Sequence, residues 1–177
     1  VLTPYPNQNK KLKSNNQLKS DKIFLKAGKE YIDASYDKAP FTHFETILMQ
    51  AFRDAPIMQK PALSGPRDKR VYELRSYESA TEKIYRNKVE MFNEGGEVAL
   101  FKRLGFNAIF YADVISGSRM PNLMYITSFE DKASRDAHWK TFVDDPEWKR
   151  LSGLAQYQKN VSKADIIFLR PTAYSDY

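Results

Sequence analysis

The residue types that could do chemistry gather on two short segments with strand-like alternation. Residues 70–77 read RVYELRSY, and residues 106–114 read FNAIFYADV. Side chains on a strand alternate between its two sides, so every second residue of a segment shares one face. A carboxylate, a guanidinium and phenols on one face would form a ligand site with a capacity for acid–base catalysis. The candidate ligand-binding residues are Glu73, Arg75, Tyr77, Tyr111 and Asp113.

A structural role is the alternative for the central pair of this set. Glu73 and Arg75 stand two positions apart on one strand, so their side chains share a face and can form an ion pair. A buried ion pair of this kind can fix the register between structural units without taking part in catalysis. The sequence leaves both interpretations open.

Few other residues support catalysis or metal binding. The chain has no cysteine, which excludes disulfides, thiolate nucleophiles and zinc–thiolate sites. Its two histidines, His43 and His138, form no metal-binding spacing, and we expect His138 to face solvent or an interface. Gly95–Gly96 and the SGS turn at 116–118 lack the lysine and hydroxyl that complete a phosphate-binding loop. We therefore expect no cofactor and no metal, and leave the catalytic residues unassigned.

The charge of the chain is basic, with a formal net charge of +6 and a pI of about 9.3. Much of the excess comes from lysines that lie among Asn, Gln and Ser rather than among Arg and aromatic residues, which indicates a solvated helix face and no nucleic-acid partner. These are Lys10, Lys11, Lys13, Lys19, Lys22, Lys26 and Lys29. The chain shows no apolar run long enough for a transmembrane segment and no visible signal peptide, so we expect a soluble protein. Export and a cytoplasmic location in a bacterium both fit.

The candidate residues must be positioned by the last hundred residues, which alternate between strand and helix patterns. Strands are predicted at 70–77, 106–114, 123–129 and 164–170. One helix runs through 104 with a break at Gly95–Gly96, and another begins at Asp131 or Ser134 and restarts at Pro146. The apolar stripe of that second helix predicts core positions at Trp139, Phe142, Trp148 and Leu151.

This order, β-α-β-β-α-β, predicts an α+β fold of the ferredoxin-like type. Both helices should cover one face of a four-stranded antiparallel sheet. We expect Tyr72, Leu74 and Ser76 to face the helices, and the candidate residues to lie on the open face.

The first part of the chain resembles the closing half of the same unit. A strand at 1–5, a helical stretch at 10–34 and a strand at 41–52 give the order β-α-β. We interpret residues 1–55 as a partial first ferredoxin-like repeat that lacks its opening half. Residues 56–69 are then a linker, and residues 70–177 the complete domain.

Two motifs in the last hundred residues resemble one known family. The run YELRSY at 72–77 is similar to the opening strand of NIPSNAP domains. The run RDAHWKTF at 135–142, followed by DPEWK at 145–149, is similar to the second-helix signature of that family. The resemblance covers residues 69–174, and the early segment fits the tandem arrangement found in the family.

The resemblance implies the dimeric α+β barrel superfamily, in which two ferredoxin-like sheets face each other within a chain or between chains. That superfamily includes cofactor-free monooxygenases, isomerase-like enzymes and haem enzymes, whereas NIPSNAP members have no settled catalytic activity. We therefore expect a non-catalytic barrel, assembled as a homodimer, that binds a small molecule or a protein partner. The alternative is a cofactor-independent monooxygenase or isomerase acting on a small aromatic or anionic substrate, with Arg75 as anion binder, Glu73 as base, and Tyr77 or Tyr111 as proton donor.

Overall fold

The computed structural model describes residues 1–176. They divide into two compact units, residues 1–45 and residues 46–176. Residues 46–69 thus lie with the sheet, whereas the sequence pattern grouped 46–55 with the first segment. The interpretation of residues 1–55 as a partial repeat stays a prediction.

The first unit consists of three short helices, α1 (Gln8–Leu18), α2 (Lys22–Ala27) and α3 (Lys29–Ile32). The helical stretch is interrupted because the Asp21 carboxylate accepts hydrogen bonds from the N–H groups of Ile23 and Phe24 and so starts α2 anew. The predicted strand at 1–5 is not formed, which corrects that expectation. No residue of these three helices is buried.

The second unit is built on a five-stranded antiparallel sheet. The strands are β1 (Leu48–Ala51), β2 (Val71–Glu78), β3 (Asn107–Ser116), β4 (Asn122–Phe129) and β5 (Lys163–Leu169), in the order β1-β3-β4-β2-β5. Strands β2 to β5 are the four predicted ones, in the ferredoxin-like arrangement, so the predicted α+β fold class is confirmed. Strand β1 adds a fifth to the β3 edge.

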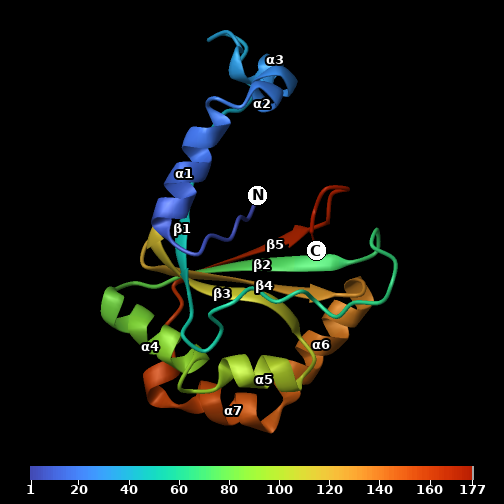
Figure 1. Ribbon diagram of the computed structural model, residues 1–177. Helices are drawn as coiled ribbons and strands as arrows, with labels where there is room; N and C mark the ends of the chain where they lie inside the picture. The colour runs from blue at the N-terminus through green and yellow to red at the C-terminus, as the bar shows by residue number, and fades with distance from the viewer. Residues whose placement is uncertain (177) are drawn as a thin grey trace. The chain divides into compact units, whose positions relative to one another are not determined.

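Helices cover one face of this sheet (Figure 1). They are α4 (Glu82–Phe92), α5 (Glu97–Arg103), α6 (Lys132–Asp144) and α7 (Pro146–Gly153), and a 3-10 turn, η1 (Ala155–Tyr157), follows. Both predicted breaks are confirmed. Gly96 has a φ of +88°, a conformation that suits glycine, and an atom at the Cβ position of Gly95 would stand 2.6 Å from the carbonyl oxygen of Met91. Asp145 ends α6 and caps α7, with Pro146 in the first turn.

Aromatic rings fill the space between these helices and the sheet. Phe101 lies at the centre, with ring centroids 4.8 Å from Phe142 and 4.7 Å from Phe106. The predicted core positions of the second helix are confirmed: Phe142 and Leu151 are buried, and Trp139 and Trp148 pack against the cluster.

The segment before β2 is fastened to the sheet rather than free. The Phe52 N–H donates to the Tyr111 carbonyl at 2.9 Å, and the Gln59 N–H to the Ile109 carbonyl at 2.8 Å. Further along, the Glu130 carboxylate accepts hydrogen bonds from the N–H groups of Ser64 and Gly65, each at 2.7 Å. The predicted strand at 41–52 thus shortens to β1, and the linker covers the outer edge of β3.

Candidate functional site

All five candidate residues lie on the helix-covered face of the sheet, and the expectation that they face outward was wrong. Glu73 and Arg75 contact α6, and Tyr111 packs on Phe92 of α4 and Phe101 of α5.

The residues that were expected to face the helices lie instead on the other face of the sheet. Tyr72 and Leu74 join a second apolar cluster that contains Phe110 and Ile126 and packs against Met58. Strand alternation was thus correct, but the assignment of its two sets to the two faces was reversed.

Glu73 is the centre of the polar network. Its carboxylate is fully buried, and it accepts hydrogen bonds from Arg75 Nε at 2.5 Å and from Trp139 Nε1 at 3.2 Å. Arg135 of α6 adds two donors, Nε to Oε2 and Nη2 to Oε1, the latter at 3.1 Å. Both carboxylate oxygens are therefore occupied, and the network joins β2 to α6.

Besides its ion pair with Glu73, Arg75 contacts two aromatic side chains. Its guanidinium carbon lies 3.6 Å from the centroid of the Trp139 ring, a close cation–π contact. Its Nη1 donates to the Tyr77 hydroxyl at 2.8 Å, and that hydroxyl lies 3.0 Å from the hydroxyl of Tyr125. Arg135 and Trp139 both belong to α6. This one helix therefore supplies the second cation that contacts Glu73 and the ring that contacts Arg75.

Tyr111 and Asp113 extend the same face along β3. The Tyr111 ring stacks on Tyr125, with centroids 5.6 Å apart. The Asp113 carboxylate accepts a hydrogen bond from the Tyr85 hydroxyl of α4. The structure thus joins Glu73, Arg75 and Tyr77 in one hydrogen-bonded network. Tyr111 contacts this network through the ring of Tyr125, whereas Asp113 bonds to Tyr85 of another helix, α4.

The pKa shifts follow from these contacts. Burial alone would raise the pKa of Glu73, but the hydrogen bond from Arg135 and the charge of Arg75 outweigh it, so the pKa is lowered. Burial raises the pKa of Asp113, and the hydrogen bond from Tyr85 only partly opposes this. Burial likewise raises the pKa of Tyr111 above its ordinary value. The carboxylate proposed as a base is therefore a weak one, and the phenol proposed as a proton donor is a weak acid.

A second buried ion pair, between α4 and α5, was not found by sequence reasoning. Lys88 Nζ lies 2.8 Å from Glu97 Oε2, with side chains only 7% and 3% exposed. The ammonium also lies 4.6 Å from the centroid of the Phe92 ring. Lys88 lies three positions before Met91, near the end of α4, and its sequence context does not distinguish it from a solvated lysine. Only the Gly95–Gly96 bend indicates that Glu97 turns back toward it.

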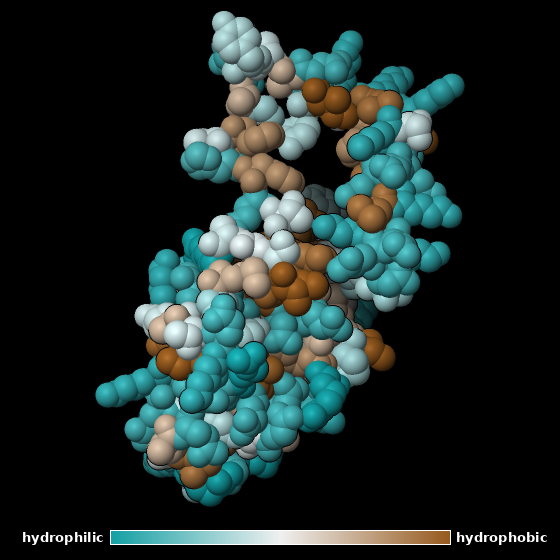
Figure 2. Space-filling view, turned by 90° about the vertical axis from the view of Figure 1, so that its left-hand side faces the viewer, coloured by the Kyte–Doolittle hydropathy of each residue, from teal (hydrophilic) through white to brown (hydrophobic). Residues whose placement is uncertain are grey.

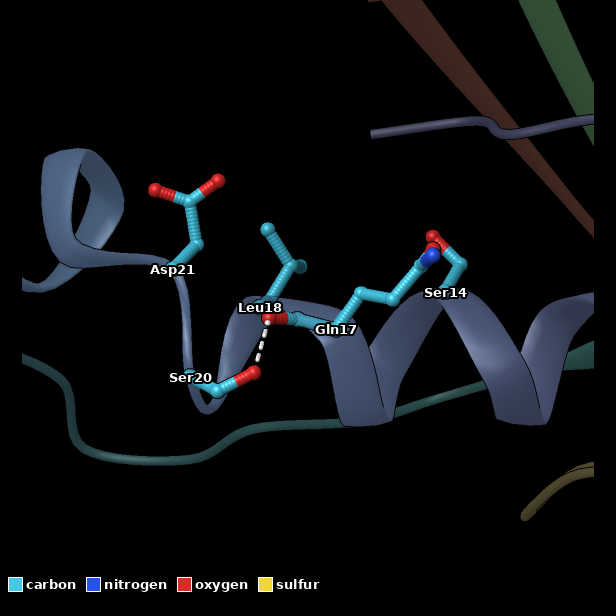
Figure 3. A pocket seen from close by; sticks show the side chains of 5 residues that line it. All are labelled: Ser14, Gln17, Leu18, Ser20 and Asp21. Atoms are coloured by element: carbon cyan, nitrogen blue, oxygen red, sulfur yellow. Dashed lines mark hydrogen bonds between the residues drawn. The ribbon is translucent and has the colours of Figure 1, made fainter.

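Two hollows of the surface are lined by residues outside this network. One, of about 400 Å³, runs along the end of α1 and is lined by Ser14, Gln17, Leu18, Ser20 and Asp21. Figure 3 shows these side chains, with the Ser20 hydroxyl donating to the Gln17 carbonyl. The other, of about 550 Å³, lies on the outer side of α6 near Lys140 and Asp144. Neither contains any of the five candidate residues.

The described residues form no cluster of potential metal ligands. Within residues 1–176, no three His, Cys, Asp or Glu side chains stand close enough to hold a metal ion. His138 is half-buried, donates from Nδ1 to the Ser134 carbonyl at 2.7 Å, and packs on the rings of Phe106 and Phe129. In the same described part, no helix has the length and apolar character needed to cross a bilayer.

Comparison with known proteins places this geometry in a family. The sequence model of NIPSNAP matches residues 72–176. No curated protein matches the chain. A NIPSNAP-like domain protein from Burkholderia xenovorans superposes with a TM-score of 0.54 at 17% identity, covering 62% of this chain and 91% of that one. Two NIPSNAP family proteins from Agrobacterium tumefaciens give TM-scores of 0.52 at 15% and 18% identity, covering 66% and 64% of this chain and 97% and 98% of theirs. The structures share the fold, the family match spans more than half of the sequence, and the chain therefore belongs to the NIPSNAP family.

Proposed function

We propose that this NIPSNAP chain is a non-catalytic protein that acts by binding a polypeptide partner with its sheet. The observation that carries the proposal is the state of Glu73. The strongest candidate for a general base is fully buried, and both of its oxygens accept hydrogen bonds from Arg75, Arg135 and Trp139.

The alternative of a cofactor-independent monooxygenase or isomerase has less support. A general base must reach a substrate proton within hydrogen-bond distance, but the hydrogen bonds that the Glu73 carboxylate accepts all come from donors of its own chain. Its lowered pKa also disfavours proton uptake near neutral pH. The Glu73–Arg75–Arg135 network instead resembles a brace that fixes α6 on β2.

The distribution of apolar surface supports a polypeptide rather than an enclosed small molecule. The helix layer, in the lower part of Figure 2, presents a mostly hydrophilic surface with isolated hydrophobic residues on the face shown. Strand β5, in contrast, exposes four consecutive large apolar side chains, Ile166 to Leu169. An exposed strand of this kind offers main-chain hydrogen bonds and apolar contacts to an added strand.

The test uses the two tryptophans of the chain as reporters. Trp139 Nε1 donates to Glu73, whereas Trp148 packs between Phe142 and other core residues. Benzoate and phenol, titrated into isotopically labelled protein, represent an aromatic anion and an aromatic substrate. We expect no saturable change in the Trp139 indole N–H resonance.

A saturable shift of the Trp139 resonance, without one at Trp148, would overturn the proposal, because it would place a small-molecule site at the network. Tyr77→Phe serves as the check on such a result. It removes the hydroxyl that contacts Arg75 and Tyr125 but keeps the ring. A genuine site would lose affinity in this variant.

A further inference from the structure

The basic charge of the chain comes from one short segment. Residues 8–29, which form α1, α2 and the start of α3, contain seven lysines and a single acidic residue, Asp21. Their net charge of +6 equals the formal net charge of the whole chain, so the basic and acidic residues of the remaining sequence balance. We call residues 8–29 the basic segment. It lies outside residues 72–176, which match the family model.

The charges of the basic segment are not compensated by other side chains. Among residues 1–176, none of its seven lysines takes part in an ion pair. Lys11 is half-buried, and the other six lysines are exposed. The carboxylate of Asp21 accepts hydrogen bonds from the backbone at the start of α2. The segment therefore presents a concentrated positive potential to any surface that approaches it.

Large apolar side chains are exposed among these lysines. Ile23 of α2 is 82% exposed, and Leu12 of α1 is 61% exposed. Leu18, Phe24 and Leu25 are exposed as well. The upper part of Figure 2 shows hydrophobic side chains next to hydrophilic ones on this unit. Apolar side chains that gather at a surface, with polar residues around them, mark a site where a protein or a membrane is bound.

The helices of the basic segment gain little support from the protein itself. Helix α1 has 11 residues and α2 has six, and no residue of either is buried. Isolated helices shorter than about 12–15 residues are marginal in water, and most helices in proteins are stabilised by burying an apolar face. A surface that takes up Leu12 and Ile23 would supply that missing burial.

We propose that the basic segment docks on the surface of a membrane that contains anionic lipids. Lysine ammonium groups close to such a surface are attracted by its negative potential. The aliphatic side chains fit the boundary between headgroups and acyl chains, where amphipathic helices lie in the plane of the membrane. The site consists of the first unit alone, so the inference goes beyond the proposed function and does not rest on it.

A nucleic acid fits the same charge less well. No arginine precedes Arg53 in the sequence, whereas nucleic-acid sites commonly combine arginine with lysine. Four of the five exposed large apolar side chains of α1 and α2 are aliphatic and offer no ring on which a base could stack. Aliphatic side chains match the interior of a lipid layer instead.

Co-sedimentation of the full chain with lipid vesicles tests the proposal. We expect binding to vesicles of phosphatidylcholine mixed with phosphatidylglycerol, weaker binding as sodium chloride is added, and no binding to phosphatidylcholine alone. A triple variant of α1 should lower the partition coefficient by at least about tenfold, and glutamine keeps the helix propensity of lysine. Its substitutions are Lys10→Gln, Lys11→Gln and Lys13→Gln. A matched triple variant removes the same charge at exposed positions of the second unit and should lower the coefficient by less than about threefold. Its substitutions are Lys102→Gln, Lys140→Gln and Lys149→Gln.

The apolar contribution is tested by a second pair of variants. Ile23→Ser removes the most exposed aliphatic side chain of α2 and should lower the partition coefficient by at least about threefold. Ile57→Ser is the matched control, since Ile57 is 70% exposed in the second unit, and it should leave the coefficient unchanged. Urea unfolding followed through Trp139 and Trp148 shows that the second unit is intact in every variant.

Three results would overturn the proposal. The first is a chain that does not sediment with the anionic vesicles at low salt. The second is binding that the α1 variant weakens no more than its matched control does. The third is a chain that binds a DNA duplex but not the vesicles, because the basic segment would then be a nucleic-acid site. None of these results changes the Trp139 titration, so failure of the inference and failure of the proposed function can be told apart.

Discussion

The buried carboxylate of Glu73 gives the sharpest prediction about stability. Glu73→Gln keeps the size of the side chain and one acceptor oxygen, but it places an NH₂ group among donors from Arg75, Arg135 and Trp139. The two guanidinium groups then lose their common anion. Their side chains are only 12% and 16% exposed, so solvent replaces little of what is lost.

The magnitude follows from the burial of the pair. Removing one partner of a buried ion pair costs about 3–5 kcal/mol, because the remaining charge is left uncompensated. Since Gln retains part of the hydrogen bonding, we expect a loss of about 3 kcal/mol in the free energy of unfolding. For a chain of this size that corresponds to a fall of roughly 10 °C in Tm.

The stabilisation that the Glu73 carboxylate provides also depends on pH, and the direction of its pKa shift fixes the sign of that dependence. The pKa of Glu73 is lowered from its ordinary 4.5, because hydrogen bonds and positive charges outweigh burial. Its stabilising contribution is therefore complete above pH 4.5 and is lost as the pH falls through the lower folded-state value. The difference in stability between the wild-type chain and Glu73→Gln should narrow in that acidic range.

Urea unfolding followed by tryptophan fluorescence measures these differences. Glu94→Gln is a matched control, since Glu94 is half exposed and pairs with Arg53 at the surface, and it should change the midpoint only slightly. An unchanged midpoint for Glu73→Gln at neutral pH would refute the reasoning, because it would mean that the two arginines do not need the carboxylate.

Three further predictions use the same unfolding assay. Lys88→Met leaves Glu97 buried without its cation and should lower the free energy of unfolding by about 3 kcal/mol; an unchanged value would contradict the 2.8 Å pair. Gly96→Ala forces alanine to a φ of +88° and should cost about 1–2 kcal/mol, whereas Gly153→Ala, where an added methyl group meets nothing within 4 Å, should cost nothing. Asp113→Asn should stabilise the chain at neutral pH, because burial raises the pKa of Asp113 above 3.8 and penalises its ionised form; the gain should shrink as the pH falls through the raised value, and a loss at neutral pH would contradict this.

The elements of the second unit could be predicted from the sequence because local signals agree with the tertiary structure. The alternation of residues 71–78, the break at Gly95–Gly96 and the Asp145–Pro146 start are each decided by neighbours in the chain. The elements of the first unit were harder to predict, because local signals there do not agree with the tertiary structure. A strand at 1–5 has no partner among the described residues, and the segment at 41–52 forms a strand only where β3 is available.

The orientation of the candidate residues could not be predicted from alternation alone. A period of two separates Glu73, Arg75 and Tyr77 from Tyr72 and Leu74, but it does not tell which set faces the helices. Polarity was a misleading guide, because a helix can bury charged residues if it supplies their partners.

A usable signal was nevertheless present on α6. Arg135 and Trp139 are four positions apart and so lie on one side of the helix. A cation and an indole N–H on the inner stripe indicate that the facing strand carries an acceptor. The contacts of residues 59–65, by contrast, depend on backbone groups that no side-chain pattern reveals.

The central claim is that Glu73 lies between the sheet and α6, and a double-mutant cycle tests it most directly. Glu73→Gln and Arg135→Met are made singly and together, and the free energies of unfolding are compared. Since Arg135 contacts both oxygens of Glu73, we predict a coupling energy of about 2 kcal/mol or more. Effects that add to within about 0.5 kcal/mol would show that the two side chains do not meet, and would contradict the placement of Glu73 beneath α6.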